Sequence, residues 1–97
     1  MRNAVGPVLR MSDEIDAIVN AIREDNPDKE VEVIDRGAYV RVQCERRMRV
    51  SRETIERNVG RRFEMRELEP MLSAFAGRIT YTSDDVVWEY ARGEEPA

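Results

Sequence analysis

The apolar residues of the chain recur with two different periods, and each period predicts a type of element. One group of four is spaced i, i+3, i+4 and i+7, namely Ile15, Ile18, Val19 and Ile22. This spacing predicts an amphipathic helix that buries one side against a sheet or another helix. Ser12 is suited to cap its N-terminus, and acidic residues at 13, 14 and 16 favour the positive end of the helix dipole. The turn-forming residues 25–28 predict where the helix ends, because the residue before Pro27 disfavours helical backbone.

Alternation of apolar and polar side chains predicts a hairpin in the next part of the chain. Residues 30–35 and 38–44 alternate in this way, which is typical of half-buried strands. The link between them is only Arg36 and Gly37, and Gly37 can adopt positive φ. We therefore expect an antiparallel pair of strands joined by a tight turn.

Two shorter apolar stretches also predict strands. Residues 4–10 contain Pro7, which has no N–H to donate to a ladder, so we expect an edge strand or an extended arm. Met48 and Val50 predict a brief strand further along the chain.

Two helices are predicted between these strands and the C-terminal part. Ser51 is a suitable cap for a short helix that carries Ile55 and Val59 and ends at Gly60. A third helix is predicted from about residue 65 to 77, because Leu68, Leu72 and Phe75 align on one side. Pro70 conflicts with that helix, since proline removes a hydrogen bond and clashes with the preceding turn. We expect either a kink or a helix whose regular part begins near 70.

The C-terminal part predicts two more strands, and the order of elements then gives a fold class. The strands cover residues 78–82 and 86–91 around a turn at 83–85, with Val86, Trp88 and Tyr90 on one face. The order is strand, helix, hairpin, followed by strand, two helices, hairpin. This order predicts an α+β fold of two β-α-β-β-like halves, with antiparallel sheets and three helices.

The length of the chain limits it to one core. Its 97 residues favour a single domain over residues 1–97, with flexible termini at about 1–3 and 93–97. No long apolar edge or unused hydrophobic stripe requires a second copy, so we expect a monomer.

The charges are divided unevenly along the chain. The formal net charge is −4, but residues 41–66 carry nine basic and four acidic groups, whereas both flanks are acidic. Nucleic-acid binding is the first interpretation of a basic stretch, and the overall acidity and the lack of interleaved aromatic residues argue against it. A surface for a protein partner, or internal charge balance, fits better.

The missing residue types exclude most catalytic classes. The chain has no histidine, which excludes Ser-His and Cys-His nucleophile pairs and histidine metal sites. Its single cysteine, Cys44, cannot form an internal disulfide, an iron–sulfur site or a structural zinc site, and its position in a strand pattern predicts a small buried apolar group. We expect no cofactor and no metal, and carboxylate-only catalysis remains a formal alternative.

The apolar runs also indicate where in the cell the protein is expected. None approaches the roughly 20 residues that cross a bilayer, and the N-terminal stretch lacks the pattern of a signal peptide. We expect a cytoplasmic protein that does not bind membranes.

Several short motifs follow one another over about residues 3–90, and their order and spacing are more informative than any single motif. They are Asn3-Ala4-Val5-Gly6-Pro7 with Arg10, Asp25-Asn26-Pro27 with Lys29-Glu30, Asp35-Arg36, Ala38-Tyr39-Val40-Arg41, Gly60-Arg61 with Phe63 and Met65, Glu67-Leu68-Glu69, and Phe75-Ala76-Gly77. In this the chain resembles the effector (regulatory) proteins of the bacterial methane, phenol and toluene diiron monooxygenases, most closely the toluene monooxygenase type. It departs from them at Glu64, where members have an asparagine that caps a helix better, and at Pro70, where they have an apolar residue.

The resemblance implies a cofactor-free, non-catalytic protein. Such a protein binds the diiron hydroxylase component near its active site and tunes electron transfer, oxygen activation, coupling and product selectivity. Candidate partner-binding residues are Asn3, Gly6, Pro7, Asn26, Tyr39, Arg41, Met65, Met71, Ser73 and Phe75.

Different arguments support these candidates. Asn3 lies in an expected mobile segment where a polar residue has little structural reason to match the family. Tyr39 and Arg41 share the exposed face of a strand and are residue types enriched in interface hot spots, unless a second helix layer covers that face. The candidates from Met65 to Phe75 are expected on or near the third helix, and the basic stretch 46–66 is expected to steer docking onto an acidic surface.

Three other functions are consistent with parts of the pattern. A generic α+β interaction module with an unrelated partner is the main alternative. A small RNA-binding domain would need stacking aromatic residues on its central strands. A carboxylate-dependent enzyme would turn over substrate alone.

Overall fold

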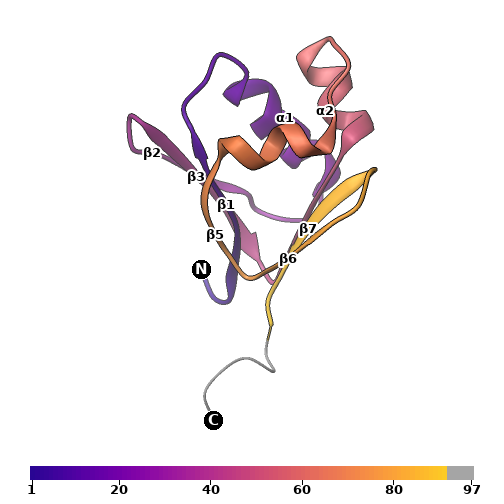
Figure 1. Ribbon diagram of the computed structural model, residues 1–97. Coiled ribbons are helices and arrows are strands. Elements are labelled where there is room, and N and C mark those ends of the chain that lie inside the picture. The colour runs from indigo at the N-terminus through magenta and orange to yellow at the C-terminus, as the bar shows by residue number, and fades with distance from the viewer. Residues whose placement is uncertain (92–97) are drawn as a thin grey trace.

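Two antiparallel sheets and three helices make up the fold in the computed structural model, which describes residues 1–91 (Figure 1). The four-stranded sheet has the order β2-β3-β1-β5, and the three-stranded sheet has the order β4-β7-β6. The strands are β1 (Ala4–Arg10), β2 (Glu32–Asp35), β3 (Tyr39–Glu45), β4 (Arg47–Ser51), β5 (Leu72–Ala76), β6 (Arg78–Tyr81) and β7 (Asp85–Glu89). The helices are α1 (Ile15–Asp25), α2 (Arg52–Val59) and the 3₁₀-helix η1 (Met65–Met71).

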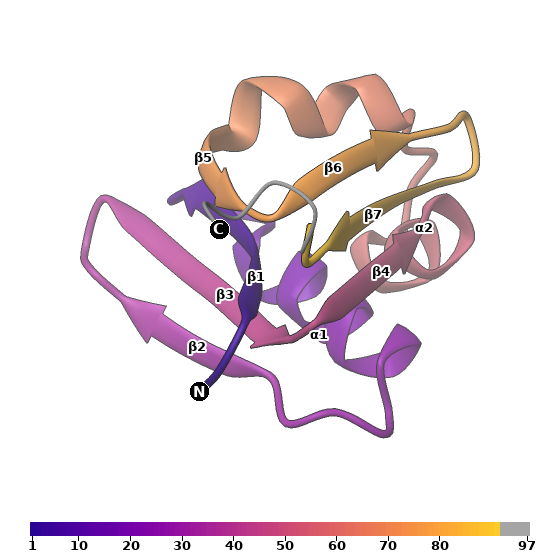
Figure 2. The same ribbon diagram turned by 90° about the horizontal axis from the view of Figure 1, so that it is seen from below.

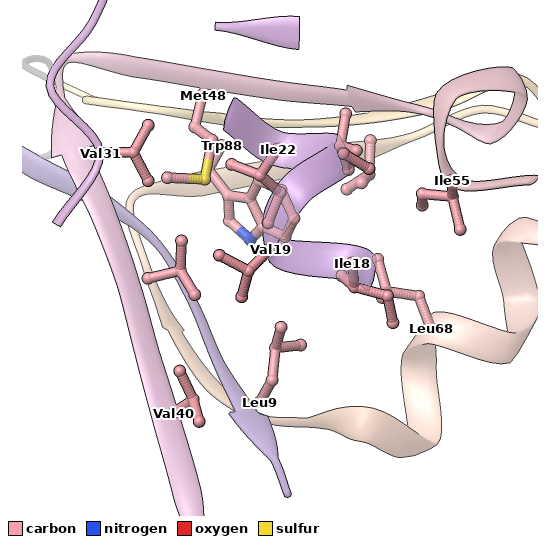
Figure 3. Packing of buried hydrophobic residues seen from close by; sticks show 14 of the residues in the cluster. Leu9, Ile18, Val19, Ile22, Val31, Val40, Met48, Ile55, Leu68 and Trp88 are labelled. Carbon is pink, nitrogen blue, oxygen red and sulfur yellow. The ribbon is translucent and has the colours of Figure 1, made fainter. Parts of the chain in front are cut away.

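The core lies between the helices and the inner faces of both sheets. The predicted stripe of α1 is buried, and its side chains join residues of all parts of the fold in one hydrophobic cluster. Figure 3 shows Trp88 of β7 beside Val19 and Ile22 of α1, with Met48 of β4 next to its ring. Trp88 and Met48 are both 0% exposed. Burying a side chain of this kind stabilises a fold by roughly 1.5–3 kcal/mol, so this contact fixes α1 on the three-stranded sheet.

Two glycines allow segments of the chain to approach each other closely. Gly6 has a φ of +137°, and a Cβ there would overlap the backbone oxygen of Val42. Gly77 has a φ of +94°, and a Cβ there would lie 2.8 Å from a methyl carbon of Val5. A larger residue at either position would therefore push strands apart as well as strain the backbone.

The first strand has the predicted bounds but not the predicted place. β1 lies inside the four-stranded sheet, between β3 and β5, so the expectation of an edge strand or arm is wrong. Within the described chain, Gly6 and Pro7 have no ladder partner on β3, and the register with β5 shifts between Val8 and Leu9. These irregularities tolerate a residue that cannot donate a hydrogen bond, which is why Pro7 can lie in a central strand.

The third helix is shorter and of another type than predicted. Residues 65–71 form a 3₁₀-helix, and residues 72–76 form strand β5 instead of a further helical turn. The i→i+3 pattern of η1 accommodates Pro70 better than an α-helix would. Glu64 occupies the cap position, and its N–H donates to the Glu67 carboxylate at 2.8 Å as in a capping box.

The other local predictions are confirmed with small shifts. The β2–β3 hairpin forms with Gly37 at a φ of +82°, Ser51 accepts a hydrogen bond from the Thr54 N–H as the cap of α2, and Gly60 ends that helix. Ser12 is not the cap of α1, because the helix begins at Ile15 and Glu14 occupies the cap position. β7 begins at Asp85 and ends at Glu89, and the expected flexible segment 93–97 lies outside the described residues.

The α+β class with antiparallel sheets and three helices is confirmed. The first half is β1-α1-β2-β3, and the second half inserts β5 between its last helix and its hairpin. Because β5 pairs with β1, the second half completes the sheet of the first.

Candidate partner-binding face

The outer side of the four-stranded sheet presents an ordered row of side chains. Ile34 pairs with Arg41, Arg41 with Val8, and Val8 with Ala74, so the row crosses β2, β3, β1 and β5 in turn. Arg10 pairs with Tyr39 in the neighbouring row. Residues directly opposite each other in antiparallel strands project to the same side of a sheet. We call the surface formed by Val8, Arg10, Ile34, Tyr39, Arg41 and Ala74 the open sheet face.

Solvent reaches this face. Tyr39 is 40% exposed, Arg10, Arg41 and Ala74 are exposed, and Val8 and Ile34 are half-buried. The alternating residues Leu9, Val40 and Val42 point to the other side and are buried. In Figure 2, α1 lies behind β1 and β4, on that buried side. The alternative of a second helix layer over Tyr39 and Arg41 therefore does not hold in the described chain.

Strand β5 is an edge of the four-stranded sheet, and it adds Ala74 to the open sheet face and other exposed residues beside it. In the described residues, β5 pairs only with β1, so its outer backbone edge is unpaired. Ser73, Ala74 and Phe75 are exposed, and Phe75 at 47% is among the largest exposed apolar side chains. Ser73 and Phe75 thus lie on a surface strand and not on a helix as predicted. An exposed aromatic residue among small neighbours is a suitable anchor for a pocket on another protein.

Other candidates from the sequence lie inside the fold. Gly6 and Pro7 are buried, Met65 is 4% exposed, and Met71 is half-buried where η1 meets β5. Gly6, Pro7 and Met65 therefore support the surface from inside the fold and do not present side chains to a partner. Met71 is partly accessible at the edge of that surface.

Asn26 is a structural link and is satisfied within the chain. Its amide nitrogen donates to the carbonyl oxygens of Ile22 at 2.6 Å and Arg49 at 2.7 Å, and its amide oxygen accepts from the Arg49 N–H at 3.1 Å. The residue is 6% exposed. Asn26 therefore joins the end of α1 to β4, which explains its place in the motif without any partner.

Asn3 also has a structural reason to be asparagine. Its φ is +54°, a region that asparagine tolerates better than most residues, and its carbonyl oxygen accepts from the Arg46 N–H at 2.9 Å. The argument that a polar residue has little structural reason at position 3 is therefore wrong.

Several arginines on or beside the helices are paired within the chain. Arg61 donates to Glu14 at 2.7 Å and to Glu67 at 3.2 Å, and Arg57 donates to Glu24 at 2.7 Å. The Arg61 hydrogen bond lowers the pKa of the Glu14 carboxyl below its ordinary value. Arg47, Arg49 and Arg52 also form ion pairs. Most of the basic stretch thus balances charges of the fold, and less of it is free to steer docking than the sequence suggested.

Arg10 and Arg41 differ from these arginines. Within residues 1–91, neither guanidinium has an ion pair or hydrogen bond to another side chain. The open sheet face therefore carries two uncompensated positive charges beside apolar groups.

The described residues offer no group of three or more His, Cys, Asp or Glu side chains that could hold a metal ion. Cys44 is buried as predicted, its thiol donates to the carbonyl oxygen of Arg47 at 3.2 Å, and burial raises the pKa of the thiol. No helix in residues 1–91 is both long and apolar enough to cross a membrane.

Sequence reasoning missed Val8, Ile34 and Ala74. Their only signal was the alternation within each strand, and it takes the register of three strand pairs to bring them into one row with Arg41.

Together these features define a small α+β domain with a closed core and, on its four-stranded sheet, a face open to solvent. A family model described as MmoB/DmpM matches residues 3–89, and the chain belongs to that family.

Two relatives extend this result. The chain is 43% identical over 88 residues to the effector subunit of the alkene monooxygenase system of Xanthobacter autotrophicus (strain Py2), covering 91% of this chain and 87% of the relative. It is 30% identical over 90 residues to the phenol 2-monooxygenase stimulatory component DmpM of Pseudomonas sp. (strain CF600), covering 93% and 98%. These relatives are named as effector or stimulatory components, not as catalytic subunits.

Solved structures agree with the fold. A chain in a structure of a phenol hydroxylase–regulatory protein complex superposes with a TM-score of 0.79 at 28% identity, covering 91% of this chain and 99% of that one. The regulatory protein B of soluble methane monooxygenase, at 22% identity and a TM-score of 0.70, shares the fold; the match covers 97% of this chain and 70% of that one.

Proposed function

We propose that the chain is the effector component of a bacterial multicomponent monooxygenase and binds its diiron hydroxylase component. The observation that carries this proposal is the 43% identity over 91% of the chain to an alkene monooxygenase effector subunit. The similarity to the regulatory protein of a phenol hydroxylase complex supports the same partner.

Such a protein acts through differential affinity. It binds one conformation of the hydroxylase more tightly than another and thereby shifts the population toward the first. Moving a two-state equilibrium from 1:99 to 99:1 requires about 10⁴-fold tighter binding to the favoured state. We propose that the favoured state has a changed environment at the diiron site, which alters electron transfer, oxygen activation, coupling and product selectivity.

The open sheet face and the β5 edge are the proposed contact surface. Tyr39, Arg41, Ser73 and Phe75 are exposed there, with Met71 at the margin. Tyrosine and arginine are enriched among residues that carry most of the binding energy of an interface. Gly6, Pro7, Asn26 and Met65 act by holding this surface in shape. We further propose that the free chain is a cytoplasmic monomer.

The RNA-binding alternative finds little support in the positions of the strand aromatics. Trp88 is fully buried, and Tyr81 and Tyr90 are half-buried, so they do not form an exposed stacking platform.

The test is a titration of the cognate hydroxylase and its reductase chain with this protein, measuring product formed per NADH consumed. A saturable rise in rate or coupling near one effector per active site is the expected result. A flat response without detectable binding would overturn the proposal and leave an interaction module with another partner. Turnover by the isolated chain would instead favour the carboxylate-dependent enzyme.

A further inference from the structure

Two arginines on the open sheet face have no ion pair or side-chain hydrogen bond within residues 1–91, although the molecule is acidic overall. Glu14 and Glu24 beside the helices each accept from an arginine, whereas Arg10 and Arg41 have no carboxylate partner in residues 1–91. We propose that the hydroxylase presents to this face a helix with two carboxylates one turn apart, which pair with Arg10 and Arg41. This inference rests on the proposed function and specifies the chemistry of the partner surface.

The spacing of the two arginines suits a helix. Arg10 pairs with Tyr39 and Arg41 is two residues further along β3, so the two arginines are diagonal neighbours on one face. Diagonal neighbours in antiparallel strands lie about 7–8 Å apart at Cα and less at Cβ. Side chains at i and i+3 or i+4 of a helix lie about 5–6 Å apart. Two flexible arginine side chains span that small difference, so each can meet one carboxylate.

The surroundings of the arginines require such partners. Ile34, Val8 and Ala74 provide an apolar row on which a helix would exclude water. A guanidinium covered by that helix without a carboxylate would be desolvated and unpaired, which is strongly unfavourable. The small side chain of Ala74 leaves room for the helix to approach the sheet.

The charges on the open sheet face are also distributed unevenly. At the far end, Glu32 accepts a hydrogen bond from the Gln43 side chain at 2.7 Å, and Glu45 accepts from the Arg2 N–H at 3.0 Å. By register, Glu32 and Glu45 project to the same side as Arg41. The face is therefore positive at one end and negative at the other, and an acidic helix is favoured at the positive end only.

Charge reversal tests the inference directly. We would measure the affinity of the full chain for the intact hydroxylase for wild type, Arg10→Glu, Arg41→Glu and the double variant, at low and moderate salt. The matched control is Arg62→Glu, an exposed residue beyond α2 whose side chain has no ion pair in the described chain and whose reversal changes the net charge equally. Circular dichroism and thermal unfolding would verify that each variant folds.

We expect each single reversal on the open sheet face to weaken binding about 10-fold or more and to reduce its salt dependence, because each removes an interfacial ion pair. We expect the control to change affinity less than about twofold, as for an exposed charge outside the interface. If wild type binds and stimulates while the double variant matches the control, the inference is wrong and the proposed function stands. If wild type itself does not bind, the proposed function fails and the inference fails with it.

A cross-linking experiment identifies the carboxylates. Arg41→Lys places a primary amine on the open sheet face of a chain whose only lysine is Lys29. A carbodiimide then activates a carboxylate of the hydroxylase, and the amine displaces the activating group as a urea to form an amide. Mass spectrometry should locate the link on a helix with a second acid three or four residues away. Arg62→Lys is the control, and equal cross-linking of both variants would contradict the inference.

Discussion

Arg57 and Arg61 beside the helices and Arg10 and Arg41 on the open sheet face are used in opposite ways. Beside the helices, Arg57 and Arg61 join helices to one another through carboxylates, and on the three-stranded sheet Arg49 of β4 is paired with Asp85 of β7. On the open sheet face, Arg10 and Arg41 have no such partners in the described chain. The same residue type therefore stabilises the fold on one side and leaves binding capacity on the other. The difference predicts that substitutions on the two sides separate stability from affinity.

The largest loss of stability is expected at Gly6, where β1 lies close to the backbone of β3. Gly6→Ala would place a methyl group against the Val42 carbonyl oxygen at a φ of +137°. We expect a loss of roughly 3 kcal/mol or more of unfolding free energy, since both steric overlap and backbone strain contribute. Urea unfolding monitored by circular dichroism measures it.

Gly37→Ala is the matched control for Gly6→Ala. Its φ is +82°, but a Cβ there meets nothing within 4 Å. We expect a loss of about 1 kcal/mol from backbone strain alone. Equal losses at both glycines would show that the close approach of β1 and β3 does not require glycine.

A slightly smaller loss of stability is expected at the link between α1 and β4. Asn26→Ala removes three hydrogen bonds and leaves the N–H and carbonyl of Arg49 without their partner. Each unsatisfied buried group costs about 1–3 kcal/mol, so we expect roughly 2–4 kcal/mol in total. Asn20→Ala, at an exposed position of α1, should change stability by less than about 0.5 kcal/mol. If the hydroxylase affinity of folded Asn26→Ala fell as strongly as its stability, Asn26 would be a contact residue after all.

Substitutions on the proposed contact surface, which combines the open sheet face with the β5 edge, should show the reverse behaviour. Phe75→Ala and Tyr39→Ala remove side chains that are 47% and 40% exposed. We expect changes of less than about 1 kcal/mol in unfolding free energy, but a loss of about 1–2 kcal/mol in binding to the hydroxylase, as for interface aromatic residues. Isothermal titration calorimetry and urea unfolding on the same samples compare the two. A variant with unchanged affinity would remove that residue from the contact surface.

The contrast between local and long-range structure also explains what the sequence could predict. The stripe of α1, the β2–β3 hairpin and the caps of α2 depend on residues close in the chain, and all were predicted. Tyr39 and Arg41 were placed correctly because alternation within β3 sets their face. The central position of β1 and the joining of Ala74 to Val8 depend on pairing with residues about 65 positions away, which periodicity does not encode.

The prediction of the third helix was wrong for a related reason. Leu68, Leu72 and Phe75 have helical spacing, and that spacing alone cannot distinguish a helix from a 3₁₀-turn followed by a strand. Pro70 weakens the α-helix locally, and the free edge of β1 then offers backbone partners to residues 72–76. Tertiary pairing thus overrode the local pattern where the proposed contact edge is formed.

The smallest change in unfolding free energy is expected from ion pairs within the fold, and the dependence of stability on pH measures it. The hydrogen bond from Arg61 lowers the pKa of Glu14, and the hydrogen bond from Arg49, followed by that from Thr82, lowers the pKa of Asp85. Because these pKa values are lower in the folded than in the unfolded chain, their contribution is complete above about pH 5 and is lost as pH falls through the folded-state values. We therefore expect unfolding free energy to decline below about pH 5, and Arg61→Gln to make that decline shallower. Carboxyl titration by NMR should show the Glu14 pKa returning toward its ordinary value in Arg61→Gln, with Asp85 unchanged. Arg41→Gln should leave the decline as in wild type, since Arg41 holds no carboxylate among residues 1–91. A shallower decline in Arg41→Gln would mean that the open sheet face, like the surface beside the helices, uses its arginines to stabilise the fold.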